Sequence, residues 1–222
     1  IAKDRVAPQY RMSVILSTMV VGIAGYHYFR IFGSWEAAFV LEGGAYVASG
    51  TPFNDAYRYM DWLLTVTLLV VELLLLCSVA AEKKEDLIFK TVVATVLMLI
   101  FGYLGETSGG TSLTDSRGVF GFLSTVPFVY IVWVLWNEVT IAMADKEGHL
   151  KVLYRNIRLL LIFTWGYYPI VYMAPFIMDP SSALVNVQVG YTIADVAAKA
   201  GYGCLIYAIA RAKSDEEGFA VA

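Results

Sequence analysis

A carboxylate and a lysine lie four residues apart in the apolar stretch DVAAKAGYG, at Asp195 and Lys199. On a helix this spacing places the two side chains on one face, one turn apart. A lysine in the middle of a membrane span must be paired, neutralised or covalently modified, because it cannot easily reach water. A buried amine can condense with a carbonyl compound. Lys199 is therefore a candidate for a Schiff base, whose positive charge requires a counter-ion.

A second group of polar residues lies in RYMDWLLTVTLLVVE, at Arg58, Asp61, Thr65 and Glu72. Their spacings keep all four side chains on one narrow face of a helix with about 100° per residue. Asp61 and Glu72 are then about 16 Å apart along the helix axis. Asp61 is thus a further candidate counter-ion, Arg58 balances the excess negative charge, and Glu72 extends a ladder of ionisable groups through the membrane.

The pair Asp195 and Lys199 is, by itself, also compatible with a structural salt bridge in a transporter bundle. Glu72 favours the functional interpretation, since it is a carboxylate far from the lysine. Ionisable residues inside membrane helices usually face the bundle interior and mark functional sites.

The composition identifies the chain as an all-α integral membrane protein. It has 222 residues, of which 59% are hydrophobic and only 16% are charged, with a mean hydropathy of +0.64. In soluble domains, about a quarter of the residues are charged. The net charge of −3 argues against a nucleic-acid partner. Cys77 and Cys204 lie in apolar runs, and neither a disulfide framework nor a metal site is predicted.

Six segments have the length and hydropathy of a membrane span. They form a single predicted domain over residues 1–222, and they cover residues 10–32, 56–81, 87–105, 118–143, 150–177 and 183–212. The connector after the first segment has alternating apolar residues and paired glycines, which predict a short β-hairpin.

The basic residues predict the topology. If the six segments alternate in direction, all Lys and Arg except Arg30, Arg58, Arg117 and the candidate Lys199 lie on one side. That side is expected to be cytoplasmic by the positive-inside rule. The protein is therefore expected in the cell membrane as a multi-pass protein with both chain ends, including the C-terminus, in the cytoplasm.

Four motifs resemble those of the microbial rhodopsins: RYMDWLLTVTLLVVE, DVAAKAGYG, WGYYPIVY at 165–172 and AGYHYFRIFGSWEAA at 24–38. The last is similar to the proteorhodopsin–xanthorhodopsin branch, and the resemblance covers essentially the whole chain. The family fold is a seven-helix bundle. Matching the motifs makes the six segments family helices two to seven, with the first helix absent from this sequence.

The resemblance implies that Lys199 carries all-trans retinal as a protonated Schiff base. It implies that Asp61 is the counter-ion and proton acceptor, that Asp195 is the second counter-ion, and that Glu72 is the cytoplasmic proton donor. Residues matching those that tune the counter-ion are His27, Arg58 and Thr65.

The resemblance also implies a retinal pocket formed by Trp62, Leu69, Gly121, Trp165, Tyr168, Pro169 and Tyr172. Many relatives have a bulky aromatic residue in place of Gly121. A glycine there leaves a gap in the pocket wall, and xanthorhodopsin-like members use such a gap to seat a carotenoid antenna. The alternative is that Gly121 serves close helix packing, which is common in membranes.

The expected function is that of a light-driven outward proton pump, an ion transporter and not an enzyme. Its expected partners are protons and the lipid bilayer, and the protein is expected to form a homo-oligomer. A photosensory rhodopsin that signals to a partner protein is the alternative. The group that releases the proton is left open among Glu36, Glu42 and Glu106.

Overall fold

The computed structural model describes residues 3–77 and 79–219. Two short 3₁₀ helices, Lys3–Arg5 and Pro8–Tyr10, precede the long helices. The further elements are α1 (Arg11–Ala38), β1 (Phe39–Glu42), β2 (Ala45–Ala48), α2 (Ala56–Leu76), α3 (Ala81–Ser108), α4 (Ser116–Ala144), α5 (Gly148–Tyr172), α6 (Ala174–Ile177), α7 (Pro180–Val196), the π-helical turn η3 (Ala197–Gly201) and α8 (Tyr202–Glu216).

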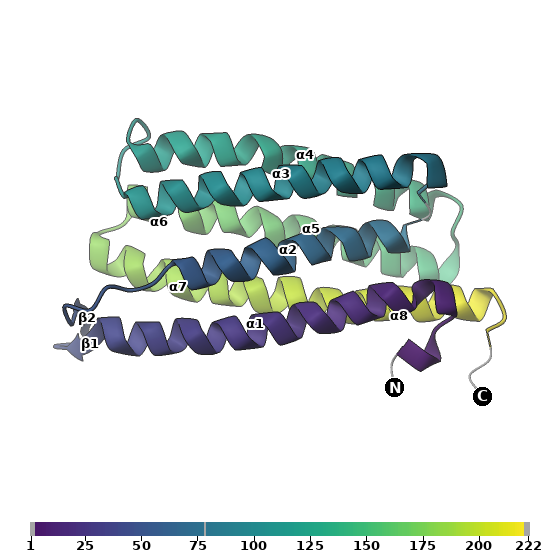
Figure 1. The fold of residues 1–222 in the computed structure, drawn as a ribbon, viewed down its shortest axis with the longest axis horizontal. Coiled ribbons are helices and arrows are strands. Elements are labelled where there is room, and N and C mark those ends of the chain that lie inside the picture. Colours follow the sequence, from purple (N-terminus) through teal and green to yellow (C-terminus); the bar gives the residue numbers. More distant parts are fainter. Residues whose placement is uncertain (1–2, 78, 220–222) are drawn as a thin grey trace.

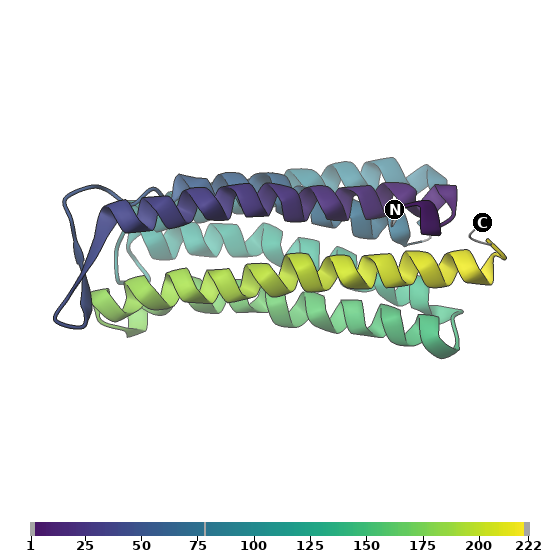
Figure 2. The ribbon, with the colours of Figure 1, turned by 90° about the horizontal axis from the view of Figure 1, so that it is seen from below.

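The long helices lie side by side along the long axis of the molecule (Figure 1). α1 packs against α2 and α8, α3 packs between α2 and α4, and α5 packs against α4, α7 and α8. Figure 2 shows the same bundle at a right angle, with the start of α1 and the end of α8 at one end and the hairpin at the other. The interior is therefore enclosed by helices from both halves of the chain.

The predicted hairpin is confirmed. β1 and β2 pair antiparallel, with Phe39 opposite Ala48 and Glu42 opposite Ala45. Gly43 and Gly44 make the turn with φ of 58° and 86°, a backbone conformation that glycine adopts without strain. The ring of Trp35 at the end of α1 lies 4.5 Å from the ring of Phe39, which holds the hairpin against the helix.

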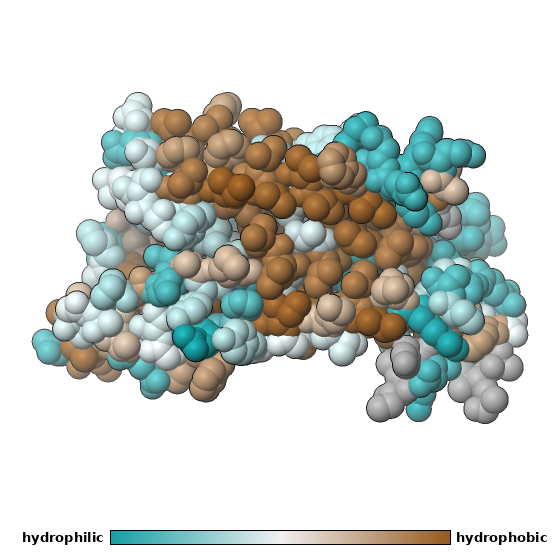
Figure 3. Space-filling view, in the orientation of Figure 1, coloured by the Kyte–Doolittle hydropathy of each residue, from teal (hydrophilic) through white to brown (hydrophobic). Residues whose placement is uncertain are grey.

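Five helical segments within the described residues are long and apolar enough to cross a membrane: Pro8–Ala38, Ala56–Leu76, Ala81–Ser108, Ser116–Ala144 and Pro180–Glu216. α5 is the other long helix, and its first half carries Lys151, Arg155 and Arg158. Figure 3 shows a broad apolar surface between hydrophilic ends. Large apolar side chains such as Phe122 and Phe163 are exposed on this bundle, as is expected for a surface that faces lipid.

The predicted absence of the first helix of the bundle is not confirmed. Apart from the four-residue α6, the described residues form seven α-helices, beginning with the long helix α1. The prediction counted the last apolar segment as a single helix. In the structure, the π-helical turn η3 divides that segment into α7 and α8.

Several helix ends differ from the predicted spans. α1 continues beyond residue 32 to Ala38. α2 ends at Leu76, before the predicted residue 81, because the backbone becomes extended at Cys77. α5 ends at Tyr172, and α6 follows it. Pro175 cannot continue α5, since it has no N–H to donate to the preceding turn.

α7 begins at a well-formed N-cap. The side chain of Asp179 accepts a hydrogen bond of 3.0 Å from the backbone N–H of Ser182, and the hydroxyl of Ser181 donates to the same oxygen. These hydrogen bonds to the carboxylate lower the pKa of Asp179. Pro180 follows at the first helical position, where its missing N–H has no consequence.

Candidate functional site

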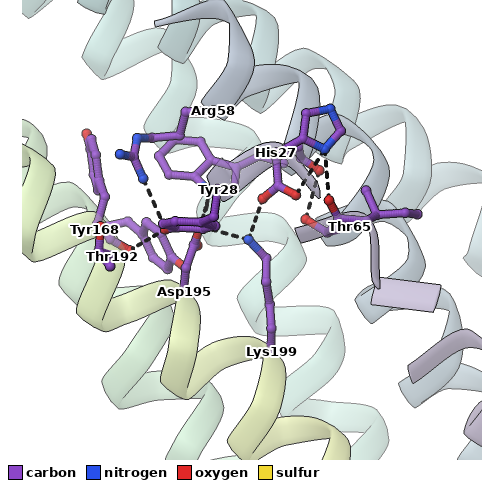
Figure 4. Close-up of polar contacts among 12 residues, drawn as sticks. His27, Tyr28, Arg58, Thr65, Tyr168, Thr192, Asp195 and Lys199 are labelled. Carbon is purple, nitrogen blue, oxygen red and sulfur yellow. Dashed lines mark hydrogen bonds and ion pairs between the residues drawn. The ribbon is translucent and has the colours of Figure 1, made fainter. Parts of the chain in front are cut away.

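Lys199 lies in the π-helical turn η3, between α7 and α8. Its Nζ atom is 2.5 Å from Oδ2 of Asp61 and 2.7 Å from Oδ2 of Asp195. The three side chains are 4%, 0% and 1% exposed. Figure 4 shows the amine of Lys199 pointing toward α1 and α2, away from its own helix. The structure thus brings together the cation and both carboxylates that the sequence singled out.

Asp195 is held by hydrogen-bond donors from three other helices. Tyr28 of α1 donates to its Oδ2 atom at 2.7 Å. Trp62 of α2 donates through Nε1 to Oδ1 at 3.0 Å, and the hydroxyl of Tyr168 from α5 donates to the same oxygen. With Lys199, both oxygens of this carboxylate are therefore satisfied, and its position is rigidly defined.

Asp61 has fewer partners. Among the described residues, its Oδ1 atom has no hydrogen-bond partner. Nδ1 of His27 lies 3.6 Å from this oxygen and contacts the backbone oxygen of Ile23 at 3.0 Å. The hydroxyl of Thr65 donates to the backbone oxygen of Asp61 and not to its carboxylate. Thr65 and His27 therefore lie beside Asp61, while the carboxylate itself keeps a free oxygen.

Arg58 is buried and reaches the two carboxylates indirectly. Its Nη1 atom donates to the hydroxyl of Tyr28 at 3.1 Å, and its Nη2 atom donates to Oε1 of Gln188 at 2.6 Å. The guanidinium also lies 5.3 Å from the centre of the Tyr191 ring. Because Tyr28 in turn donates to Asp195, Arg58 connects to the site through this tyrosine.

Glu72 is fully buried on the same face of α2, three turns beyond Asp61. Neither carboxyl oxygen has a hydrogen-bond partner among the described residues. Leu69, Leu73 and Leu76 are buried around it on the same helix. The environment of Glu72 is therefore largely apolar, with the side chain of Ser17 from α1 nearby, in contrast to that of Asp195.

A mostly apolar cavity opens beside Lys199, and it has a volume of about 800 Å³ when its mouth is included. Its wall contains all seven residues of the expected pocket: Trp62, Leu69, Gly121, Trp165, Tyr168, Pro169 and Tyr172. Further lining residues that the sequence did not indicate include Tyr59, Met98, Leu99, Ser124, Phe128 and Tyr191. A cavity of this size and lining suits an elongated apolar ligand attached to the amine.

Comparison with known families agrees with this geometry. The model of the family described as "Bacteriorhodopsin-like protein" matches residues 1–213. The chain belongs to this family. This bacteriorhodopsin-like chain is accordingly a multi-pass membrane protein with the mostly helical rhodopsin fold.

The relatives include proteorhodopsins and rhodopsins of known structure. Green-light absorbing proteorhodopsin from Gamma-proteobacterium EBAC31A08 is 31% identical over 210 residues, which cover 95% of this chain and 78% of the relative. Xanthorhodopsin, described as a light-driven ion pump with dual chromophore, is 51% identical with a TM-score of 0.89, over 99% of this chain and 87% of the other. Thermophilic rhodopsin is 47% identical with a TM-score of 0.86, over 98% and 87% of the chains.

Tyr28, Gln188 and Tyr191 of this bacteriorhodopsin-like protein surround the site but were not predicted from the sequence. A signal for two of them was present. Gln188, Tyr191, Asp195 and Lys199 are spaced so that they share one helix face, in the same way as the polar residues of α2. Tyr28 gave no such signal, because its role depends on its hydroxyl reaching Asp195 of α7 from another helix.

The three acidic residues considered for proton release are placed differently. Glu36 and Glu42 are exposed. Glu106 at the end of α3 accepts hydrogen bonds from Tyr59 at 2.6 Å and from Tyr191 at 3.4 Å. Both tyrosines contact the ring of Trp62, which donates to Asp195. Of the three, Glu106 is thus the one connected to the site.

Proposed function

We propose that this protein is a light-driven outward proton pump that carries all-trans retinal on Lys199. The observation that carries the proposal is the buried amine of Lys199, which lies between two buried carboxylates at the wall of an apolar cavity inside a membrane bundle. The relatives named as proteorhodopsin and as a light-driven ion pump support it.

The residues present suit retinal. Lys199 supplies the amine, and Trp62, Trp165 and Tyr168 supply flat aromatic walls beside it. Lys199 Nζ would hold retinal as a protonated Schiff base, and the bound retinal would supply a light-driven isomerisation. The side chains of this protein accept, hold and return the proton in the other steps of the transport cycle.

Asp61 and Asp195 have different roles at the amine of Lys199. Asp61 accepts the proton of Lys199 Nζ, because its Oδ2 atom is in hydrogen-bond contact and its Oδ1 atom is free of other donors. Asp195 stays the fixed negative partner, since three donors already satisfy its charge. His27 beside Asp61 and Arg58 beside Tyr28 adjust the electrostatic field at the pair.

Glu72 returns the proton to Lys199 Nζ from the other side. A buried carboxyl group without hydrogen-bond partners is most stable when neutral, so Glu72 stores a proton in the dark. The excess of Lys and Arg at the Glu72 end of the bundle assigns that end, and the C-terminus, to the cytoplasm. Transport from Glu72 through Lys199 to Asp61 then runs outward. Glu72 also favours a pump over a photosensor, because a sensor needs no efficient donor.

We extend the proposal to a carotenoid antenna beside Gly121, as the dual chromophore named for xanthorhodopsin suggests. Gly121 lines the cavity, and a Cβ atom there would lie 2.7 Å from Cε1 of Tyr172. The glycine therefore lets the Tyr172 ring approach α4, and a carotenoid ring at this position would pack on Tyr172. Gly121→Trp should remove energy transfer from an added carotenoid to the pigment, while direct excitation of the pigment still drives transport.

The pump is tested in cells that express the protein with added retinal. Illumination should acidify the medium, and a protonophore should abolish the change. Lys199→Ala should form no visible pigment and give no acidification. A stable pigment with a slow photocycle and no pH change would instead support a sensor, and failure of the native protein to form a pigment would support a retinal-free transporter.

A further inference from the structure

Lys213, near the end of α8, is buried although it lies close to the end of the bundle. Its side chain is only 8% exposed, whereas the nearby Asp215 and Glu217 are exposed. A lysine near a helix end usually extends its amine into water. Here the ammonium points inward, and it makes no ion pair with a carboxylate in the part of the chain that the structure describes.

The ammonium of Lys213 instead caps another helix. Its Nζ atom donates to the backbone oxygen of Leu76, the last residue of α2, at 3.0 Å. The last carbonyl groups of a helix lack partners within the helix, and a cation there also interacts favourably with the helix dipole. The hydroxyl of Tyr154 from α5 donates to the same oxygen at 3.3 Å. One carbonyl group therefore ties together α2, α5 and α8.

The beginning of the chain closes over this contact. The Tyr10 ring lies 4.7 Å from Lys213 Nζ, and its hydroxyl donates to Glu217. The backbone N–H of Ala7 donates to the hydroxyl of Ser214 at 2.8 Å. Lys213 is thus covered by the segment before α1, which explains its burial.

The contact lies between Glu72 and the end of the bundle. Leu76 follows Glu72 by one helical turn, about 6 Å along α2. Leu73, Leu74 and Leu76 have no exposed surface, and Ile206 of α8 packs in the same core. The contact of Lys213 and Tyr154 with Leu76 therefore lies one helical turn from Glu72, toward this end of the bundle.

We propose that Lys213 is a positioning residue that keeps the proton-uptake side of the bundle closed, and that it must release the Leu76 carbonyl before Glu72 is reprotonated. The inference rests on the proposed function for the role of Glu72. The closed contact itself is independent of pumping, and it can be tested in the dark.

Cys77 provides a reporter at this position. It directly follows Leu76 and is 1% exposed, while the other cysteine, Cys204, is exposed. In a Cys204→Ala background, the rate of Cys77 modification by a small maleimide measures how often the contact opens. The purified pigment is used in lipid nanodiscs, in the dark and under light.

Lys213→Met keeps the length of the side chain and removes the cation. We expect Cys77 to be modified about tenfold faster in the dark, as for the loss of one hydrogen bond from a charged donor. The late proton-uptake phase should accelerate, and the early transfer to Asp61 should not change. Lys213→Arg should stay close to native, because it keeps a cationic donor. Lys151→Met is the matched control, since Lys151 is exposed on α5.

Equal Cys77 modification rates in Lys213→Met and the parent would overturn the proposal, as would an equal acceleration in Lys151→Met. If Lys213→Met gives no pigment, Tyr154→Phe removes the other donor to Leu76 and must show a smaller acceleration in the same direction. If the parent shows no light-driven pH change, the pump fails while the labelling result still decides whether the contact is closed by Lys213.

Discussion

The buried carboxyl groups in the two halves of the bundle have opposite environments. In the half that the proposed topology places outside, Asp195 accepts hydrogen bonds from Tyr28, Trp62 and Tyr168 and pairs with Lys199. In the half that it places on the cytoplasmic side, Glu72 is as deeply buried, yet its oxygens have no partner among the described residues. The first carboxyl group lies in a polar network from four helices, and the second lies among leucines.

In the proposed pump, this difference sets the direction of proton transport. A carboxylate that is fully hydrogen-bonded is stabilised as an anion, whereas a carboxyl group in an apolar environment is stabilised as the neutral acid. Asp61, with one oxygen on Lys199 and one oxygen free, lies between these extremes. In the proposed pump, Asp195 is the fixed charge and Asp61 the acceptor, both in contact with Lys199 Nζ, and Glu72 stores a proton farther along α2.

The largest effect is expected from neutralising the acceptor. Asp61→Asn should form a pigment with a red-shifted visible band and should lose light-driven acidification entirely, because it removes the carboxylate that accepts the proton of Lys199 Nζ, while Asp195 remains a fixed anion held by its three donors. Asp195→Asn is the matched variant. Asp195→Asn should disturb pigment formation and stability more than Asp61→Asn does, since it breaks contacts with three donors. Full pumping in Asp61→Asn would contradict the division of roles between the two carboxylates.

The next largest effect is expected in the cytoplasmic half. Glu72→Gln keeps the shape of the side chain and removes the stored proton, so the last phase of the photocycle should slow about a hundredfold, the usual contribution of a positioned acid. Flash photolysis measures this phase, and added azide should restore the rate. A native recovery rate without azide would show that Glu72 does not supply the proton.

A smaller effect is expected from loosening the outer network. Tyr28→Phe removes a hydroxyl that donates to Asp195 and accepts from Arg58. The pigment should lose about 1.5–3 kcal/mol of stability, the range for a hydrogen bond to a charged group. Its thermal bleaching measures the loss. Tyr26→Phe changes an exposed neighbour and should stay within about 0.5 kcal/mol of the parent.

The smallest effect is expected at the outer mouth, where Asp55 precedes α2. Burial raises the pKa of Asp55 to about 6, the charge of Glu106 adds to the effect, and Arg58 and Arg117 oppose it. The folded state therefore disfavours the ionised form, and the resulting loss of stability develops as the pH rises through 6 and is absent below 4. Asp55 makes no side-chain cap bond, so Asp55→Asn should stabilise the pigment at pH 8 by on the order of 1 kcal/mol, allowing for partial exposure.

Asp179 serves as the comparison with the opposite sign. Its pKa is lowered by the hydrogen bonds from Ser182 and Ser181, so its contribution to stability is present above pH 4 and is lost on acidification. Asp179→Asn should therefore be slightly destabilising at pH 7 and neutral in acid. Across pH 4–8, thermal bleaching should show a stability difference from the parent that grows with pH for Asp55→Asn and stays constant for Asp179→Asn. A constant difference for Asp55→Asn would refute the assignment of Asp55.

The helical spacing of polar residues was enough to predict which of them share a helix face. The spacing within α2 placed Arg58, Asp61, Thr65 and Glu72 on one face, and all four are buried in the structure. The spacing of Asp195 and Lys199 predicted their contact within one segment. Prediction was weaker at helix ends and at η3, because a π-helical turn depends on packing around it and leaves little trace in local hydropathy.

The sequence by itself determined that the chain forms apolar helices with a lysine and carboxylates inside them, since hydropathy and helical spacing are properties of neighbouring residues. Only the tertiary structure decided which groups meet. Lys199 contacts Asp61 from a segment 138 residues away, and Tyr28 reaches Asp195 across 167 residues. Such contacts depend on how each helix is rotated and packed against the next, and this arrangement is set by the shapes of all the interlocking side chains together.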